Sequence, residues 1–190
     1  NQIKTITTFT YTNDALVLSE TNRAGNVTGN TKEVVIGDVK SETMYTGNEG
    51  EEKAEKTYNY DFEGNNVKTT TTFTYTADAL ELSVTTKLKD GDVRKSETTY
   101  TGNEGEEKAQ KTYNYSFDGL QIKTITSFFY TKDTLLSSNT NRVTSEMKSI
   151  TNYTGNEGEE KAEKTYNYNF SGNQIKTITT FTYTNDALVL

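Results

Sequence analysis

One nine-residue string recurs along this chain and limits the possible folds more than any other feature. The string TGNEGEEKA begins at Thr46, Thr101 and Thr154. A second block follows each copy, and its copies begin at Asn65, Leu120 and Asn173, while a fourth opens the chain at Asn1. Repetition at such a period is typical of stacked repeats, in which each unit buries its apolar surface against its neighbours.

The repeats divide the chain into units of unequal length. The units span approximately 1–64, 65–119 and 120–172, which makes them 64, 55 and 53 residues long. Residues 173–190 begin the next copy of a 172-residue super-repeat, because their sequence is identical to that of residues 1–18. We therefore expect the chain to be an excerpt of one longer tandem array.

Each unit is expected to form four antiparallel strands. In the second copy of the pattern we predict strands at 53–62, 67–76, 79–88 and 93–101, because apolar and polar residues alternate there. Thr, Tyr and Phe are frequent, and the chain contains no Pro that would interrupt a ladder. Tight turns are expected at 77–78 and at the matching positions 13–14, 132–133 and 185–186, and residues 25–38 suggest a longer hairpin in the first unit.

The alternation also predicts how the strands use their two faces. Tyr58 and Tyr60 share one side of the first strand, Phe73 and Tyr75 share one side of the second, and Leu80, Leu82 and Val84 share one side of the third. One-sided strands are typical of an antiparallel sheet wetted on its other face. The apolar face would close in a narrow sandwich or spiral, or against copies of the chain. The predicted fold class is all-β: tandem antiparallel hairpin or meander repeats in an elongated, fibre-like array.

Composition excludes several classes of function. Hydrophobic residues make up only 31% of the chain, so a thick core is not expected. The absence of Cys and His removes thiol nucleophiles, Cys/His zinc sites and His-based triads. A net charge of −7 argues against nucleic-acid binding, and no apolar run approaches the ~20 residues of a membrane helix. We expect no enzyme and no membrane insertion of this segment.

The acidic turn NEGEE is the one candidate for a bound ion. Several carboxylates close together on a turn could hold Ca²⁺, which takes six to eight oxygen ligands. The alternative is a solvated turn whose carboxylates pair with nearby Lys residues, and no other cofactor is expected. The calcium hypothesis rests on nine residues: Glu49, Glu51, Glu52, Glu104, Glu106, Glu107, Glu157, Glu159 and Glu160.

Two further side-chain patterns have a functional and a structural interpretation. Thr residues at every second position of a strand, as in Thr70, Thr72 and Thr74, could order water at an ice surface, but Thr is also a good strand former on a wet face. Paired Tyr residues such as Tyr58 and Tyr60 could form a platform for sugars, or a cross-strand aromatic cluster. In both cases the structural interpretation is favoured.

Part of each unit resembles a known repeat family. The segments YNYDFEGNNVKT, YNYSFDGLQIKT and YNYNFSGNQIKT resemble the YD repeats of RHS-type proteins. Asp61 keeps the Asp of that pattern, while Ser116 and Asn169 replace it. The resemblance implies β-hairpins in large secreted bacterial assemblies, although the period of 53–55 residues departs from the short period of that family.

The array of hairpins rich in Thr, Asn and Tyr is similar to those of giant surface adhesins of gliding or predatory Bacteroidota, including grappling-hook filaments exported by the type IX system. The expected function is that of a structural shaft segment in an extracellular, cell-surface filament for attachment to a surface or to prey. Its expected partner is itself, in a homo-oligomeric filament. The alternatives are an adhesin repeat that binds glycans or surfaces, and a shell segment of a YD-repeat toxin.

Overall fold

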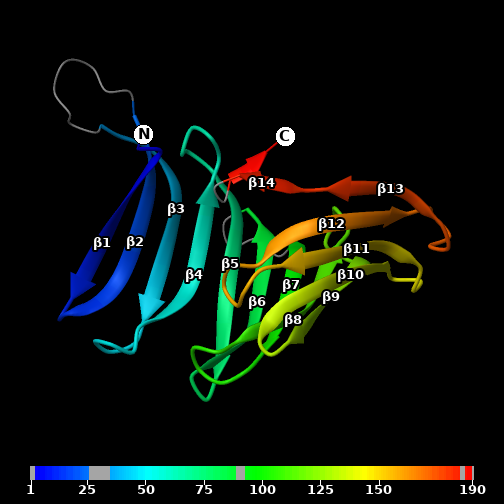
Figure 1. Ribbon diagram of the computed structural model, residues 1–190. Helices are drawn as coiled ribbons and strands as arrows, with labels where there is room; N and C mark the ends of the chain where they lie inside the picture. Colours follow the sequence, from blue (N-terminus) through cyan, green and yellow to red (C-terminus); the bar gives the residue numbers. More distant parts are fainter. Residues whose placement is uncertain (1–2, 26–34, 89–92, 185–186, 190) are drawn as a thin grey trace. The chain divides into compact units, whose positions relative to one another are not determined.

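The computed structural model describes residues 3–25, 35–88, 93–184 and 187–189. None of these residues is helical, and two groups of β-strands account for most of them (Figure 1). The first eight strands are β1 (Thr5–Thr12), β2 (Ala15–Ala24), β3 (Ile36–Thr46), β4 (Lys53–Tyr60), β5 (Val67–Thr76), β6 (Ala79–Lys87), β7 (Arg94–Thr101) and β8 (Lys108–Tyr115). The others are β9 (Ile122–Thr131), β10 (Thr134–Arg142), β11 (Met147–Thr154), β12 (Lys161–Tyr168), β13 (Ile175–Thr180), β14 (Thr182–Thr184) and β15 (Ala187–Val189).

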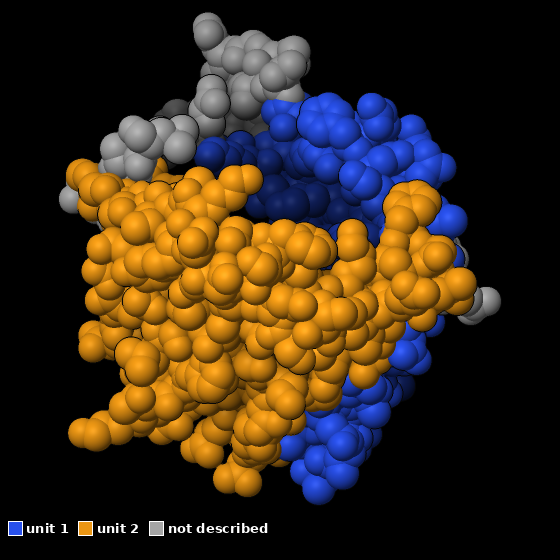
Figure 2. All heavy atoms as spheres, turned by 90° about the vertical axis from the view of Figure 1, so that its right-hand side faces the viewer, with its two compact units in different colours: residues 1–95 blue, residues 96–190 orange. Residues whose placement is uncertain are grey.

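The sheet is an antiparallel meander. Strands β1 to β13 lie side by side in the order of the sequence, and β14 pairs separately with β15. The prediction of an all-β fold made of repeated antiparallel hairpins is confirmed. The chain divides into two compact units, residues 1–95 and 96–190 (Figure 2). The repeat boundaries near residues 64, 119 and 172 remain a prediction.

Strand limits agree closely with the sequence pattern. The predicted strand 67–76 coincides with β5, and the other three differ from β4, β6 and β7 by at most two residues at one end. Both residues of the Ala77-Asp78 turn have positive φ, at 48° and 68°, and the matching residues 13–14 and 132–133 behave alike. These are the angles of a type I′ hairpin turn, whose twist matches that of the strands. Residues 185–186 and most of the long hairpin at 25–38 lie outside the described residues.

The expected division into an apolar and a polar face is wrong. The β5–β6 register pairs Tyr75 with Leu80 and Thr74 with Leu82, and it shifts between those two pairs. Because Thr74 and Tyr75 are neighbours on β5, Leu80 and Leu82 point to opposite faces. A bulge of this kind occurs in every described strand pair of the large sheet, so apolar side chains are distributed over both faces.

The described residues form very little core. Tyr58, at 8% exposure, is the only buried hydrophobic side chain among them, while Asn22 and Thr70 are buried polar residues at 2% and 3%. The register places Glu42, Tyr58 and Thr70 directly opposite one another on β3, β4 and β5. Stability therefore has to come mostly from contacts between neighbouring strands and turns, as the low apolar content predicts.

Within each compact unit, a row of threonines crosses the strands on one face. Opposed residues on neighbouring strands form hydroxyl–hydroxyl bonds of 2.8–2.9 Å, each joining residues 14 positions apart. The pairs are Thr7–Thr21, Thr43–Thr57, Thr71–Thr85, Thr98–Thr112, Thr126–Thr140 and Thr151–Thr165. Cross-strand Thr pairs of this type stabilise a sheet. On β5 the paired Thr71 alternates with Thr70, Thr72 and Thr74, so these pairs lie on the other face and both interpretations of that Thr pattern stay open.

Candidate functional site

The acidic loop adopts the same shape in each copy. It connects β3 to β4, β7 to β8 and β11 to β12, and in each copy its two glycines have positive φ. In the third copy, Gly155 has φ 127° and Gly158 has φ 78°. The turn 156–159, which follows Gly155 and contains Gly158, is closed by the N–H of Glu159, which donates to the carbonyl of Asn156 at 3.0 Å. Glycine suits both positions, because other residues rarely adopt these angles.

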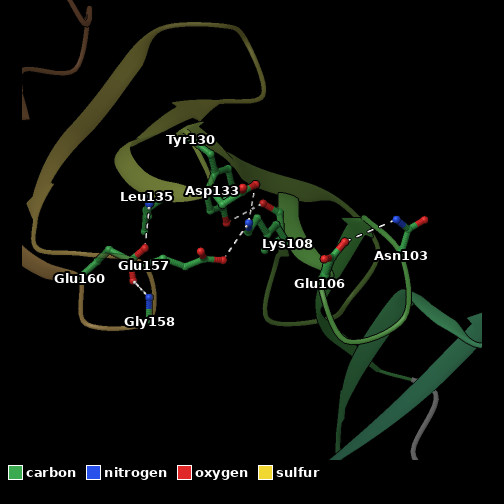
Figure 3. A network of polar contacts seen from close by, with 10 residues as sticks. Asn103, Glu106, Lys108, Tyr130, Asp133, Leu135, Glu157, Gly158 and Glu160 are labelled. Atoms are coloured by element: carbon green, nitrogen blue, oxygen red, sulfur yellow. Dashed lines mark hydrogen bonds and ion pairs between the residues drawn. The ribbon is translucent and has the colours of Figure 1, made fainter.

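The last Glu of the motif binds a neighbouring turn. One Glu160 oxygen accepts the backbone N–H of Leu135, at the start of β10, and the other accepts that of Gly158, each at 2.9 Å (Figure 3). Glu52 makes the same two bonds, to Leu16 and to Gly50. These bonds hold the pKa of both carboxyls below the ordinary value, with the Leu135 or Leu16 N–H as the main cause.

The Lys that follows the motif binds the next turn along the sheet. Lys108 lies 2.7 Å from Asp133 in the β9–β10 turn and 3.2 Å from Glu157 in the next acidic loop (Figure 3). Lys53 and Asp78 form the equivalent pair at 2.7 Å. A Tyr hydroxyl reinforces this arrangement, since Tyr130 donates to the carbonyl of Ala109 at 3.0 Å. In the first copy, where both contacts are described, the acidic loop is therefore a clasp that joins the hairpin turns on both sides of it. The later copies repeat one or other of these contacts.

The calcium hypothesis stays a prediction. Within the described ranges, no three Asp or Glu side chains are grouped so that they could hold a metal ion. Glu52 and Glu160 already accept backbone N–H groups, Glu157 pairs with Lys108, and Glu106 accepts the side-chain amide of Asn103 at 3.4 Å. In the structure these carboxylates take part in contacts within the protein.

The hairpin turn that resembles YD repeats is closed by its polar residue. Asp61 accepts the N–H of Asn65 at 2.9 Å and the side-chain amide of Asn66 at 2.7 Å, and the Asn66 amide is the main cause of its lowered pKa. Ser116 and Asn169 accept backbone N–H groups at the same place in the other copies, from Gln121 at 3.1 Å and from Asn173 at 3.1 Å. The three residue types differ, but each can accept such a turn-closing bond.

The sequence pattern assigned no role to Arg23 and Arg142, which make repeated contacts in the structure. Arg23 on β2 donates to the carbonyls of Val39 and Asp61, at 2.9 and 3.1 Å, and its guanidinium lies 5.1 Å from the centre of the Phe62 ring. Arg142 on β10 repeats this, with a 3.1 Å bond to the Met147 carbonyl and Phe170 also at 5.1 Å. Both arginines connect a strand to the YD-like turn two strands further on. Their position late in a strand, 119 residues apart, was the only available sequence signal.

The tyrosine pair is structural in the first complete copy. Tyr58 is buried, and the hydroxyl of Tyr60 donates to a carboxylate oxygen of Glu42. The pKa of Tyr60 is raised to about 12. Desolvation is the main cause, and the hydrogen bond to Glu42 and the negative charge of that residue add to it. A sugar platform made of these two rings is therefore not supported by their geometry.

Comparison with known proteins does not assign the chain to a family. No family model matches it, and no curated protein matches it either. The resemblance to YD repeats stays a prediction that rests on the three quoted segments. No described helix is long and apolar enough to cross a membrane.

Acidification should loosen the clasps. The pKa values of Glu52 and Glu160 are lower in the folded chain than the ordinary 4.5, so the folded state binds protons more weakly than the unfolded state. Their contribution is complete above pH 4.5 and is lost as the pH falls through the folded pKa values. We expect the urea midpoint to fall between pH 5 and pH 3, with a shallower fall in the variant carrying Glu52→Gln and Glu160→Gln. An equal fall in both proteins would contradict this role.

Removal of the turn-closing carboxylate should destabilise the YD-like hairpin. Asp61→Ala leaves the N–H of Asn65 without its acceptor, and we expect the melting temperature to fall by about 2–4 °C. Asp61→Asn should retain most of the stability, because Asn169 closes the equivalent turn in the third copy. Thermal unfolding followed by circular dichroism measures the difference. Equal losses in the Ala and Asn variants would show that turn closure is not the cause.

Proposed function

We propose that this chain is a shaft segment of an extracellular bacterial filament that attaches the cell to a surface or to prey. The observation that carries the proposal is the recurrence of the same contacts between turns in successive repeats. Lys53–Asp78 recurs as Lys108–Asp133, and the Glu52 bond to Leu16 recurs as Glu160 to Leu135. Contacts that recur with the repeat can extend an array by any number of units.

The mechanism in this proposal is mechanical. Backbone ladders, threonine pairs and clasps join each strand to its neighbours, and each interaction reaches only a few strands along the sheet. Such an array needs no thick core, which agrees with the single buried hydrophobic side chain among the described residues. It also needs no reactive group, and the chain has neither Cys nor His.

Self-association is the second part of the proposal. Large apolar side chains remain exposed on both ends of the strands and on the sheet itself, with Phe9 at 54%, Tyr11 at 60% and Phe117 at 90% exposure. Apolar side chains that a single chain leaves in water can be covered by further copies of the chain. A homo-oligomeric filament would provide that cover and would carry load through several chains in parallel.

Electron microscopy of proteins with one, two and four copies of residues 1–172 tests the proposal. We expect rods whose length grows in proportion to the number of copies, and a mass by light scattering above that of one chain. Compact particles that do not lengthen with copy number would overturn the shaft. Closed hollow particles would favour the shell of a YD-repeat toxin. Rods with the mass of a single chain would contradict self-association but would agree with the shaft function.

A further inference from the structure

A groove of about 500 Å³ lies beside the second acidic loop, in residues 96–190. Aromatic rings and polar side chains line it together, among them Asn103, Glu106, Lys108, Gln110, Phe128 and Tyr130. We call it the loop groove. Small-molecule sites are often concave and combine apolar walls with a few polar groups, so this groove has the composition of a binding site.

The rings of the loop groove come from one strand. Phe128 and Tyr130 are two residues apart on β9, so their side chains leave the same face of the sheet, and both are partly exposed. The hydroxyl of Tyr130 is held by the carbonyl of Ala109 at 3.0 Å, which fixes the position of that ring (Figure 3). Two aromatic side chains on one face provide an apolar wall, and the fixed Tyr130 ring loses little entropy on binding.

Two amides stand at the rim. Asn103 and Gln110 are exposed and line the groove. The β7–β8 register pairs Thr99 with Lys111 and Tyr100 with Ala109, so Gln110 has no partner residue and lies at a bulge. Bulges alter the direction of a side chain relative to the ladder. The bulge thus explains how a residue of β8 can contribute an amide to the edge of the groove.

The charges select against anions. Lys108 is already neutralised by Asp133 and Glu157, and Glu106 adds a further negative charge to the lining. A carboxylate, sulfate or phosphate would meet a net negative potential here. A neutral, polyhydroxylated ligand would instead use the carboxylates and amides as hydrogen-bond partners and place its C–H groups against the rings.

The polar side of the groove recurs in the next repeat, without an aromatic residue in its lining. A hollow of about 510 Å³ is lined by Thr154, Gly155, Asn156, Glu159 and Lys161, which match residues 101–108 of the loop groove position by position. A polar lining that recurs with the repeat favours a ligand that is itself repetitive. Several weak sites on one array would then bind one polymer far more tightly than each binds alone.

We propose that the loop groove binds a neutral hexose unit of a polysaccharide, and that successive repeats bind the same polysaccharide chain multivalently. This inference goes beyond the shaft function and does not depend on it, since one groove lies within a single compact unit. The sugar face packs against Phe128 and Tyr130, and its hydroxyl groups bond to Asn103, Glu106 and Gln110.

Titration of the ¹⁵N-labelled 190-residue chain tests the inference by NMR. The probes are maltohexaose, laminarihexaose and chitohexaose, with hexagalacturonate as the charged counterpart. At millimolar concentration we expect at least one neutral hexasaccharide to shift amide signals in residues 101–110, 128–133 and 154–161. Hexagalacturonate should shift them less. No shift with any neutral probe, or stronger binding of the uronate, would overturn the proposal.

Variants separate binding from folding. Phe128→Thr should lower the affinity for the hexasaccharide by about fivefold. Gln110→Ala, at an exposed position, should lower the affinity without affecting the melting temperature. Phe117→Thr is the matched control, because Phe117 is 90% exposed and lies in the β8–β9 turn at the opposite end of these strands. Equal affinity in all variants, or equal losses at Phe117 and Phe128, would show that the groove is not the site.

Discussion

Gly155→Ala should destabilise the chain by roughly 3 kcal/mol or more, one of the two largest effects that we expect from a single substitution. Gly155 has φ 127°, where a side chain is strained, and an added Cβ would lie 2.6 Å from the carbonyl oxygen of Glu159. The neighbouring backbone belongs to the tight turn that positions Glu160 for its bond to Leu135. The clash therefore cannot be relieved without disturbing the clasp. Urea denaturation measures the loss.

The matched control lies three residues away in the same loop. Gly158 has φ 78°, and a Cβ added to it would meet nothing within 4 Å. Gly158→Ala should therefore cost only the strain of a left-handed residue, about 1–2 kcal/mol. If the two variants lost the same stability, steric contact at Gly155 would not be the reason that this loop requires glycine there. Gly47 and Gly50 offer the same comparison in the first copy.

Strands and turns could be predicted from the sequence because they depend on local chemistry. The alternation of residues predicted both ends of β5 correctly. The Ala77-Asp78 dipeptide predicted a turn, and in the structure both of its residues have positive φ. Repetition strengthened each inference, since a hairpin predicted in one copy was expected in all of them. These features need no knowledge of which strands lie near one another.

Side-chain direction could not be predicted, because one bulge reverses it. Simple alternation placed Leu80 and Leu82 on one face, but the shift between Thr74 and Tyr75 puts them on opposite faces. A bulge adds only one residue to a strand, and no particular residue type in the sequence indicates it. The two-sided distribution of apolar residues therefore appeared only in the register.

The role of the acidic loop depended on contacts between distant residues. From the sequence, Glu52 and Glu160 were two of nine carboxylates on turns, and pairing with nearby Lys was the structural alternative. In the structure they instead accept hydrogen bonds from the backbone N–H groups of Leu16 and Leu135, which lie 36 and 25 residues earlier in the chain. Lys108 pairs with Asp133, 25 residues later, and Arg23 reaches Asp61 38 residues later. Such pairs follow from the order of strands, which the sequence pattern leaves open.

Tyr58→Ala should cost about 3 kcal/mol, because Tyr58 is the one hydrophobic side chain that the described part of the chain buries. Its ring lies between Glu42 and Thr70 in the register, and truncation would leave a gap beside a Thr that is only 3% exposed. Tyr166 occupies the equivalent place on β12, opposite Ile150, and is less buried. Tyr166→Ala should therefore cost clearly less, and urea denaturation of the two variants measures the difference. A loss at Tyr166 equal to that at Tyr58 would mean that stability is shared evenly among the repeats and does not depend on this one buried ring.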